Sequence, residues 1–295
     1  MTSRTREVRA SVLHGAKDLR IETRELAPPG ISELQISVRS TGLCGSDLHY
    51  YNHGRNGDII MREPMSLGHE SAGVVVAIGS GVSNFQIGNK VALEVGLPCA
   101  ACDRCSEGRY NICKDMRFRS SAKSFPHFQG TLQDRINHPA AWCHKLPDNV
   151  SIELGAILEP LGVTIHAMRR AQLAPKSTVL VFGARTVGLL AAAMAKIRGA
   201  SHVMIADVDE GRVHFAIDNG FAHAGYTVPI KRGNTIEANL DIAETTAVAI
   251  GKLNKTSGAQ VAEVDVVFEC TGVPSCVQTA IYVCRDTSIS HGSGC

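Results

Sequence analysis

A histidine and a glutamate stand side by side in the glycine-rich stretch at residues 68–73. The imidazole of His69 and the carboxylate of Glu70 can converge on one cation if a third ligand comes from elsewhere in the chain. Cys44 is the candidate, because it lies in a second glycine-containing turn at residues 41–49. Three protein ligands with a free fourth position are typical of catalytic zinc. The sequence therefore predicts a catalytic metal site at Cys44, His69 and Glu70.

Four more cysteines are spaced Cys-x2-Cys-x2-Cys-x7-Cys within 15 residues. Four thiolates at this spacing are typical of a closed, tetrahedral structural zinc site. The alternative is four unrelated buried thiols, which the clustering disfavours. We therefore predict structural zinc at Cys99, Cys102, Cys105 and Cys113, and interpret the other five cysteines as buried or tail thiols.

A different pattern begins near residue 151. An apolar strand at residues 178–182 leads into a turn from Gly183 to Gly188, then a helical segment at 189–197 and a strand at 203–206 that ends at Asp207. This is a βαβ unit with a phosphate-binding turn and an acidic residue about 20 positions further on, as a dinucleotide site requires. The Asp207 carboxylate would bond the ribose hydroxyls and repel a 2′-phosphate, which favours NAD over NADP.

Two regions must position these groups. Residues 11–90 show short strands and Gly/Pro turns, which predicts a β-rich, partly barrel-like unit. Residues 154–170 indicate a helix broken at Pro160 and Gly162. Further strands at 224–228 and 264–269 alternate with helical stretches and predict a parallel sheet.

Composition excludes several classes of partner. The chain has 295 residues, 44% apolar and 20% charged, with a net charge of +2, which is ordinary for a soluble two-domain protein. The charge gives no reason to expect nucleic acid or an anionic membrane. No secretory leader and no run of about 20 apolar residues is recognisable. We expect a cytoplasmic protein.

Taken together, these residues resemble the zinc-dependent medium-chain dehydrogenases, and most closely the sorbitol (polyol) dehydrogenases, including the fungal forms. The resemblance runs from about residue 8 to 282. The family pattern G-H-E-x2-G-x5-G-x2-V is met at residues 68–82, and Glu159 with the Pro-Leu after it fits the polyol branch. The alcohol dehydrogenase branch uses a cysteine near that position, and no cysteine lies between Cys143 and Cys270.

The resemblance implies an α/β fold. It comprises a GroES-like catalytic domain at residues 1–160 with a structural zinc lobe at 96–115, and a doubly wound parallel-sheet (Rossmann) NAD-binding domain at 161–283. It also implies NAD-dependent oxidation of a small-molecule polyol such as sorbitol or xylitol to a ketose. The catalytic zinc would be held by Cys44, His69 and Glu70, with Glu159 near it directly or through water.

Further roles follow from matching family positions. Ser46 would relay the substrate proton and His49 would form the outer end of the relay, although His49 is equally well a surface histidine. Tyr50 and Phe118 would line the substrate pocket together with Glu159. The cofactor residues would be Gly183, Arg185, Val187, Gly188, Asp207, Arg212 and Thr271, with Arg212 on the adenosine side.

Two departures from the family pattern change the expectations. Arg185 replaces the glycine that lets the backbone approach the pyrophosphate. We therefore expect weakened NAD binding. The opposite interpretation is that the positive charge of Arg185 pairs with phosphate and partly compensates. Residues 284–295 show no strand pattern and resemble no family segment. We therefore expect an aberrant tail, an incomplete, C-terminally truncated dinucleotide domain, an open edge on the 264–269 strand, and loss of the strand through which relatives form homo-oligomers.

Three functional hypotheses remain open. The first is an NAD- and zinc-dependent polyol dehydrogenase. The second is a catalytically impaired zinc-binding remnant of that lineage. The third is an alcohol or threonine dehydrogenase. The sequence does not select one polyol.

Overall fold

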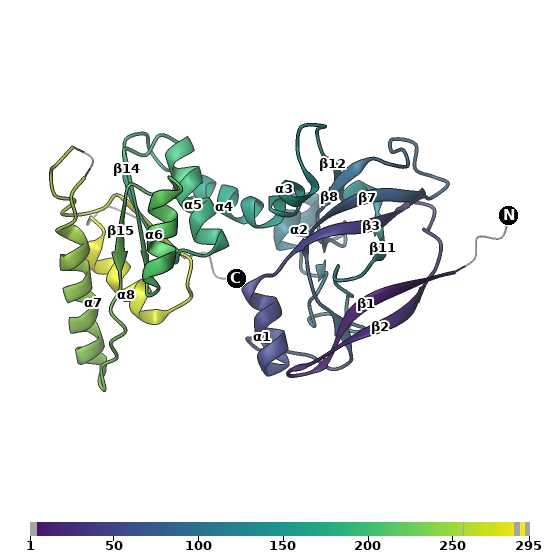
Figure 1. Ribbon diagram of the computed structural model, residues 1–295, viewed down its shortest axis with the longest axis horizontal. Helices are drawn as coiled ribbons and strands as arrows, with labels where there is room; N and C mark the ends of the chain where they lie inside the picture. The colour runs from purple at the N-terminus through teal and green to yellow at the C-terminus, as the bar shows by residue number, and fades with distance from the viewer. Residues whose placement is uncertain (1–4, 256, 286–289, 293–295) are drawn as a thin grey trace. The chain divides into compact units, whose positions relative to one another are not determined.

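The computed structural model describes residues 5–255, 257–285 and 290–292. The chain divides into two compact units, Met1–Glu159 and Pro160–Cys295. The predicted domain boundary at residue 160 lies beside this division. Each unit is described by itself below, with elements labelled as in Figure 1.

The first unit is built on antiparallel sheets (Figure 1). Its five-stranded sheet has the order β11-β3-β7-β8-β12, formed by β11 (Arg135–Pro139), β3 (Glu33–Gly42), β7 (Glu70–Ile78), β8 (Lys90–Leu93) and β12 (Cys143–Lys145). A second sheet has the order β2-β1-β6, formed by β2 (Asp18–Leu26), β1 (Arg6–Gly15) and β6 (Met65–Ser66). Two short pairs complete the unit: β4 (Arg55–Asn56) with β5 (Ile59–Ile60), and β9 (Gly96–Leu97) with β10 (Arg117–Phe118).

Strands β3 and β7 form the longest pairing of the larger sheet. Their inward side chains, including Leu34, Ile36 and Val75, are fully buried in one apolar cluster. Gly73 allows the close approach of the two strands, because a Cβ there would lie 2.3 Å from the carbonyl oxygen of Ser37. The pairing brings the end of β3 opposite the start of β7, with Gly42 facing Glu70.

The helices of this unit are short: α1 (Gly45–His53), α2 (Asp103–Ser106) and α3 (Ile152–Ala156), with 3-10 turns at Tyr110–Ile112 and Ala140–Trp142. Ser151 caps α3 by accepting a hydrogen bond from the N–H of Leu154. The helix predicted at 154–170 breaks at residue 157, so the break expected at Pro160 and Gly162 is wrong. Both residues lie inside α4 (Leu158–Ala171), because a proline in the first helical turn removes no intrahelical hydrogen bond.

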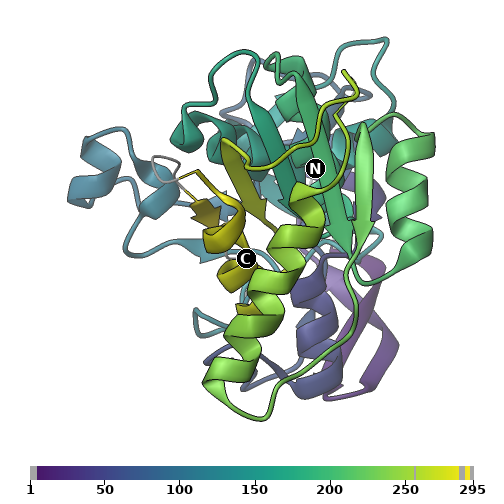
Figure 2. The ribbon, with the colours of Figure 1, turned by 90° about the vertical axis from the view of Figure 1, so that its left-hand side faces the viewer.

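The second unit is a parallel sheet in the order β15-β14-β13-β16-β17. The strands are β13 (Thr178–Phe182), β14 (His202–Asp207), β15 (Ala224–Thr227), β16 (Val266–Glu269) and β17 (Ser290–Gly292). The helices are α5 (Thr186–Ile197), α6 (Glu210–Asp218), α7 (Ile236–Gly251) and α8 (Pro274–Val283). Figures 1 and 2 show helices on both sides of this sheet.

Alternate side chains of the central strands enter two separate cores. Val179 and Val181 pack with the alanines of α5 and α6, whereas Leu180 and Phe182 pack with α7 and α8. This is the doubly wound arrangement that the sequence predicts. Because β13 lies between β14 and β16, the strand order reverses there, and such reversal points bind ligands at the carboxyl ends of the strands.

The predicted tail differs from the structure in one respect. Residues 290–292 form β17, which pairs in parallel with β16 from Val267 to Glu269. The predictions of a tail without a strand and of an open edge beside β16 are therefore wrong for these residues. Within the same predicted tail, Cys284 forms an isolated parallel bridge with Val264. Residues 286–289 and 293–295 of that prediction lie outside the described part. Within the described part, no helix is long and apolar enough to cross a membrane.

A buried arginine and histidine tie the first unit together. Arg119 is 5% exposed; it lies 4.4 Å over the ring of Phe128 and donates to the carbonyls of Gln129 and Asn137 at 2.9 and 2.6 Å. Its Nε donates to Nδ1 of His138 at 3.0 Å, so Nε2 of His138 carries the proton that it donates to the carbonyl of Glu94 at 3.0 Å. Burial, with the nearby Arg119 charge, lowers the pKa of His138 to about 3.

This pair predicts a stability change in mild acid. An unfolded histidine takes up a proton below about pH 6.5, whereas folded His138 stays neutral until pH 3 is approached. The free energy of unfolding of this unit should therefore fall as the pH drops, by about 2 kcal/mol between pH 7 and pH 5 from His138 alone. His138→Gln, whose amide can replace both hydrogen bonds, should lose this part of the slope.

The measurement is denaturant unfolding followed by fluorescence of Trp142, the single tryptophan of the chain, which lies in the first unit. Equal pH slopes for the wild type and His138→Gln would contradict the prediction.

Candidate active site

The three predicted ligands come together at the ends of β3 and β7. Cys44 lies two residues past β3 and precedes the first residue of α1. His69 directly precedes β7, and Glu70 is its first residue. One ligand atom from each, the sulfur, a ring nitrogen and a carboxylate oxygen, lies within 4.8 Å of the others. The pairing of Gly42 with Glu70 produces this proximity, because it fixes the two strand ends side by side.

Asp47 holds the candidate ligands Cys44 and His69 in place, and it is not among the residues that the sequence predicts for the site. Its side chain is 2% exposed and accepts hydrogen bonds from the backbone N–H of Cys44 at 3.1 Å and of Gly68 at 3.0 Å. It also lies 3.6 Å from Nδ1 of His69, which is too long for a hydrogen bond but short enough for strong electrostatic attraction. Asp47 therefore fixes the backbone at Cys44 and directly before His69, and it also faces the ring of His69.

Residues 118–120 form the other support. The ring of Phe118 meets that of His69 edge-on, with centroids 5.4 Å apart. Ser120 is 4% exposed and its hydroxyl donates to Asp47 at 2.7 Å. Ser120 has a φ of +63°, a conformation that costs energy for a residue other than glycine. The surrounding structure holds it there with its hydroxyl on Asp47.

The buried charges shift one another's pKa values. Burial opposes charge on His69, but Asp47 and Cys44 outweigh burial and raise the pKa of His69 to about 10. Burial likewise opposes ionisation of Cys44, but His69 and Ser46 hold the pKa of the thiol below its ordinary value. Burial raises the pKa of Glu70. It also raises the pKa of Glu159 to about 7, with His69 opposing and Glu70 adding to the shift.

The remaining predicted residues are placed as follows. Ser46 lies near enough to Cys44 to lower the pKa of its thiol, and His49 is exposed three positions further along α1. The charges of His69 and Glu70 act on the pKa of Glu159. Glu159 is nevertheless not a member of the compact group of candidate ligands. Tyr50 is 2% exposed in an apolar cluster, and its hydroxyl accepts the N–H of Ala122 at 3.1 Å; its contact with substrate stays a prediction.

The four clustered cysteines form a second candidate metal site. Their sulfur atoms are separated by 3.5 to 4.0 Å along the measured edges, and none forms a disulfide. A tetrahedron with Zn–S bonds of about 2.3 Å has edges of about 3.8 Å. The spacing of the four thiols therefore fits a zinc ion.

The turn after β13 carries the dinucleotide features. Gly183 has a φ of +95°, and a Cβ on Gly188 would lie 1.7 Å from the carbonyl oxygen of Gly183, so both positions require glycine. Arg185, between them, is the exposed N-terminal cap residue of α5 in extended conformation, with φ −95° and ψ −173°. Arg185 thus causes no backbone strain, and it is located at a helix N-terminus, a place where phosphate groups commonly bind in proteins.

Two acidic residues shape the neighbouring strand ends. Asp207 accepts the N–H groups of Ala184 at 2.7 Å and Asp209 at 2.9 Å, and it lies 3.6 Å from Arg212. Glu269 is 6% exposed; it accepts the N–H of Thr271 at 2.7 Å and the Thr271 hydroxyl. The predicted Asp207 and Thr271 therefore lie at the carboxyl ends of β14 and β16. Arg212 lies in the first turn of α6, and Val187 in the first turn of α5.

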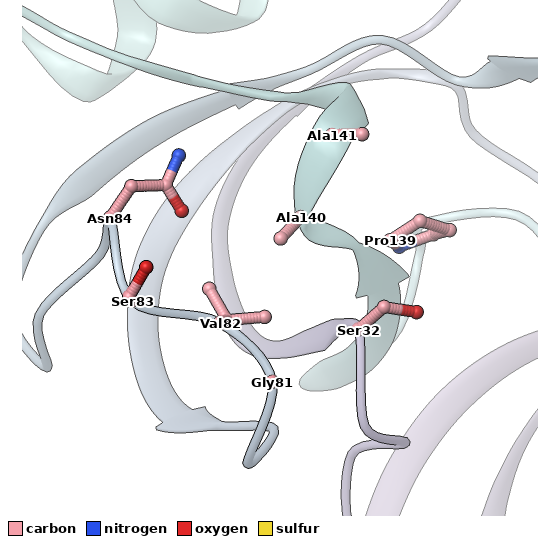
Figure 3. A pocket seen from close by; sticks show the side chains of 8 residues that line it. All are labelled: Ser32, Gly81, Val82, Ser83, Asn84, Pro139, Ala140 and Ala141. Carbon is pink, nitrogen blue, oxygen red and sulfur yellow. The ribbon is translucent and has the colours of Figure 1, made fainter.

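A separate open cavity of 320 Å³ lies elsewhere on the first unit (Figure 3). Its wall is made by Ser32, Pro139, Ala140, Ala141 and residues 81–84. None of them is a titratable or metal-binding side chain, and none was predicted for the site. This cavity therefore provides no acid, base or ligand for chemistry.

Comparison with known proteins identifies the lineage. Residues 30–148 match the alcohol dehydrogenase GroES-like domain, and residues 186–288 match the zinc-binding dehydrogenase domain. A probable D-xylulose reductase A of Emericella nidulans is 39% identical over 288 residues, covering 96% of this chain and 74% of the relative. The chain belongs to the zinc-binding dehydrogenases.

Other relatives agree with this assignment. Sorbitol dehydrogenase of Gallus gallus is 38% identical over 276 residues, covering 94% of this dehydrogenase and 72% of the relative. The solved L-idonate 5-dehydrogenase of Escherichia coli superposes with a TM-score of 0.80 at 27% identity, covering 98% and 76% of the two chains. The dehydrogenase described here thus spans about three quarters of these relatives. The predicted family and its GroES-like plus Rossmann fold are confirmed.

The donor sets fit the metal that this family binds. Thiolate, imidazole and carboxylate are all zinc ligands, and they converge here in one small buried group. Asp47 matches the usual role of a carboxylate that orients a metal-bound histidine. A signal for Asp47 existed in the sequence, since it lies three residues after Cys44 in the same turn; no sequence pattern points to Ser120, which lies 73 residues from Asp47.

The support of Asp47 by Ser120 predicts an effect on metal affinity. Ser120→Ala keeps the strained backbone but removes the hydroxyl, so Asp47 loses a charge-assisted hydrogen bond and His69 is held less firmly. We expect zinc affinity at this site to fall by about tenfold or more. Competition with a chromophoric chelator measures it, after the four-cysteine site has been filled. Ser124→Ala is the control, because Ser124 is half-buried and its hydroxyl donates to the carbonyl of Pro126 and not to Asp47; equal affinities for both variants would contradict the prediction.

Proposed function

We propose that this dehydrogenase oxidises a secondary hydroxyl of a polyol such as sorbitol or xylitol to a ketose, with transfer of hydride to NAD. The observation that carries the proposal is the convergence of Cys44, His69 and Glu70, with Glu159 near enough for the charges of His69 and Glu70 to act on its pKa. The relatives named for sorbitol and D-xylulose support the same substrate class. Cys44, His69 and Glu70 would hold the catalytic zinc, and Cys99, Cys102, Cys105 and Cys113 the structural one.

Zinc and the nicotinamide of NAD would have distinct roles. Zinc supplies the Lewis acidity that eases removal of an alcohol proton near neutral pH, and the nicotinamide supplies the hydride acceptor. The chain supplies orientation and proton transfer. Asp47 sets the direction of the His69 ring, and Phe118 packs against that ring and excludes water from one side.

Ser46 and His49 carry the proton in this proposal. Ser46 lies near the thiol of Cys44. His49 is three residues further on and projects from the same face of α1. The hydroxyl of Ser46 can take the substrate proton and pass it to the imidazole of His49. Because His49 is exposed, it can release that proton to solvent.

Glu159 suits a substrate with several hydroxyl groups. With a pKa raised to about 7 by burial, its carboxyl group exchanges readily between donor and acceptor forms at neutral pH. A neighbouring hydroxyl of a polyol can therefore hydrogen-bond it in either form. A simple alcohol offers no second hydroxyl for this contact, which separates the polyol function from an alcohol dehydrogenase function.

NAD would bind along the turn after β13 and the start of α5, at Gly183, Arg185, Val187 and Gly188. Asp207 would contact the ribose hydroxyls, Arg212 would lie on the adenosine side, and Thr271 would contribute from just past β16. A cytoplasmic location fits the cysteines, since the nine described ones are all free thiols and such thiols persist in a reducing compartment.

Replacement of Glu159 tests the substrate class. Glu159→Gln removes the ionisable group without changing its size, and kcat/KM for xylitol or sorbitol should fall by about tenfold or more. Glu153→Gln, an exposed glutamate on α3, should change nothing. Steady-state NADH formation by the zinc-loaded protein measures both. Wild-type turnover of ethanol or threonine that exceeds turnover of every polyol would contradict the proposal.

Arg185 predicts an unusual cofactor response. Its side chain occupies the place where glycine lets the backbone approach the pyrophosphate, so Arg185→Gly should tighten NAD binding several-fold. Arg198→Ala, at the other end of α5, is the control for loss of charge. Calorimetric titration with NAD measures the dissociation constants. Weaker NAD binding by Arg185→Gly would show instead that the guanidinium pairs with phosphate.

A further inference from the structure

Helix α1 carries two histidines one helical turn apart. His49 and His53 are both exposed, and their ring centroids lie 6.2 Å apart with the planes inclined at 33°. Among the described residues, no ion pair or hydrogen bond engages either imidazole. His49 has a place in the proposed proton relay, whereas His53 has none. The two rings therefore form a pair of open nitrogen donors on the helix that begins directly after Cys44.

The spacing of the pair suits chelation of one ion. Residues four apart on a helix project from the same face, and two histidines at this spacing are a known zinc-binding arrangement. An ion holds imidazole nitrogens at about 2.0–2.1 Å, so its two donors must lie roughly 3 Å apart. Both side chains are in solvent and can rotate to reach this separation without moving the helix.

The position on the helix also favours a cation. His53 is the last residue of α1, and Gly54 ends the helix with a φ of +64°. The N–H of Gly54 satisfies the carbonyl of Tyr50 at 2.8 Å, which leaves the last carbonyls of the helix as its negative end. The nearby positive charge of Arg55 is partly offset by Asp58, 3.5 Å away.

We propose that His49 and His53 form a surface binding site for a divalent transition-metal ion, separate from the two zinc sites of the dehydrogenase. Water molecules would complete the coordination, and imidazole donors select copper, nickel or zinc over magnesium or calcium. The consequence for activity rests on the proposed function. An ion bound to His49 takes the lone pair that would receive the substrate proton, so the site inhibits when it is filled.

Nickel titration of the protein loaded with its own zinc tests the site. Calorimetry should find a Ni²⁺ site in the wild type, and His53→Gln should weaken it by about tenfold or more, because the second imidazole no longer binds intramolecularly. His166→Gln is the matched control, since His166 is an exposed helical histidine with Gly162 and Arg170 at the chelating positions. Equal Ni²⁺ affinity in the wild type and His53→Gln would overturn the proposal.

An activity assay separates this proposal from the proposed function. His53→Gln should keep basal turnover, and Ni²⁺ concentrations that inhibit the wild type should leave it active. Binding that depends on His53 without inhibition of the wild type would support the metal site and remove His49 from the relay. If the protein has no turnover on any polyol, the proposed function fails while the titration still decides the metal site.

Discussion

The candidate site depends on the hydrogen bonds that the buried carboxylate of Asp47 accepts. It joins three segments that are distant in the sequence, because it accepts the N–H of Cys44, the N–H of Gly68 and the hydroxyl of Ser120. A carboxylate with this many donors is stable in its ionised form despite burial. The fixed negative charge then faces His69, so the geometry and the electrostatics of the group share one origin.

The β-sheet provides the other half of this arrangement. Pairing of β3 with β7 sets the distance between the loop of Cys44 and the His69–Glu70 pair, while Asp47 sets their orientation. Metal affinity in such sites depends on ligands that are already in place before the ion arrives, since the cost of ordering them is then met by folding. The ligands of this group stand on strand ends and a helix start rather than on a long loop, which suits that requirement.

Much of this organisation is readable in the sequence, for identifiable reasons. The glycine turns and the His-Glu pair are local patterns, and the four cysteines lie within 15 residues, so type and spacing predict them. The doubly wound sheet follows from alternating apolar strands and helices, and its family is confirmed. The roles of individual site residues remain predictions.

Other features depend on contacts that no local pattern records. Ser120 hydrogen-bonds Asp47, 73 residues away in the sequence. The hydrogen bonds of buried Arg119 go to backbone carbonyls and to His138, whereas a carboxylate would be the usual partner. The hydrogen bond from the N–H of Ala122 to the hydroxyl of Tyr50 likewise joins residues 72 positions apart. The sequence predicts a helix break at Pro160 because a sequence alone does not distinguish a proline in the first turn of a helix from one in its middle. Strand β17 was missed because its three residues show no apolar alternation.

The two candidate metal sites differ in what holds their ligands without an ion. The sheet and Asp47 hold the first group, whereas the four thiols project from a lobe made of turns, one four-residue helix and a 3-10 turn. Local stability is low where few apolar contacts exist, so removing zinc from the lobe would let that segment unravel while the sheet stays intact. A scarcity of zinc in the cell would then expose a proteolytic weak point at the lobe, and the supply of metal would govern the lifetime of the chain as well as its chemistry.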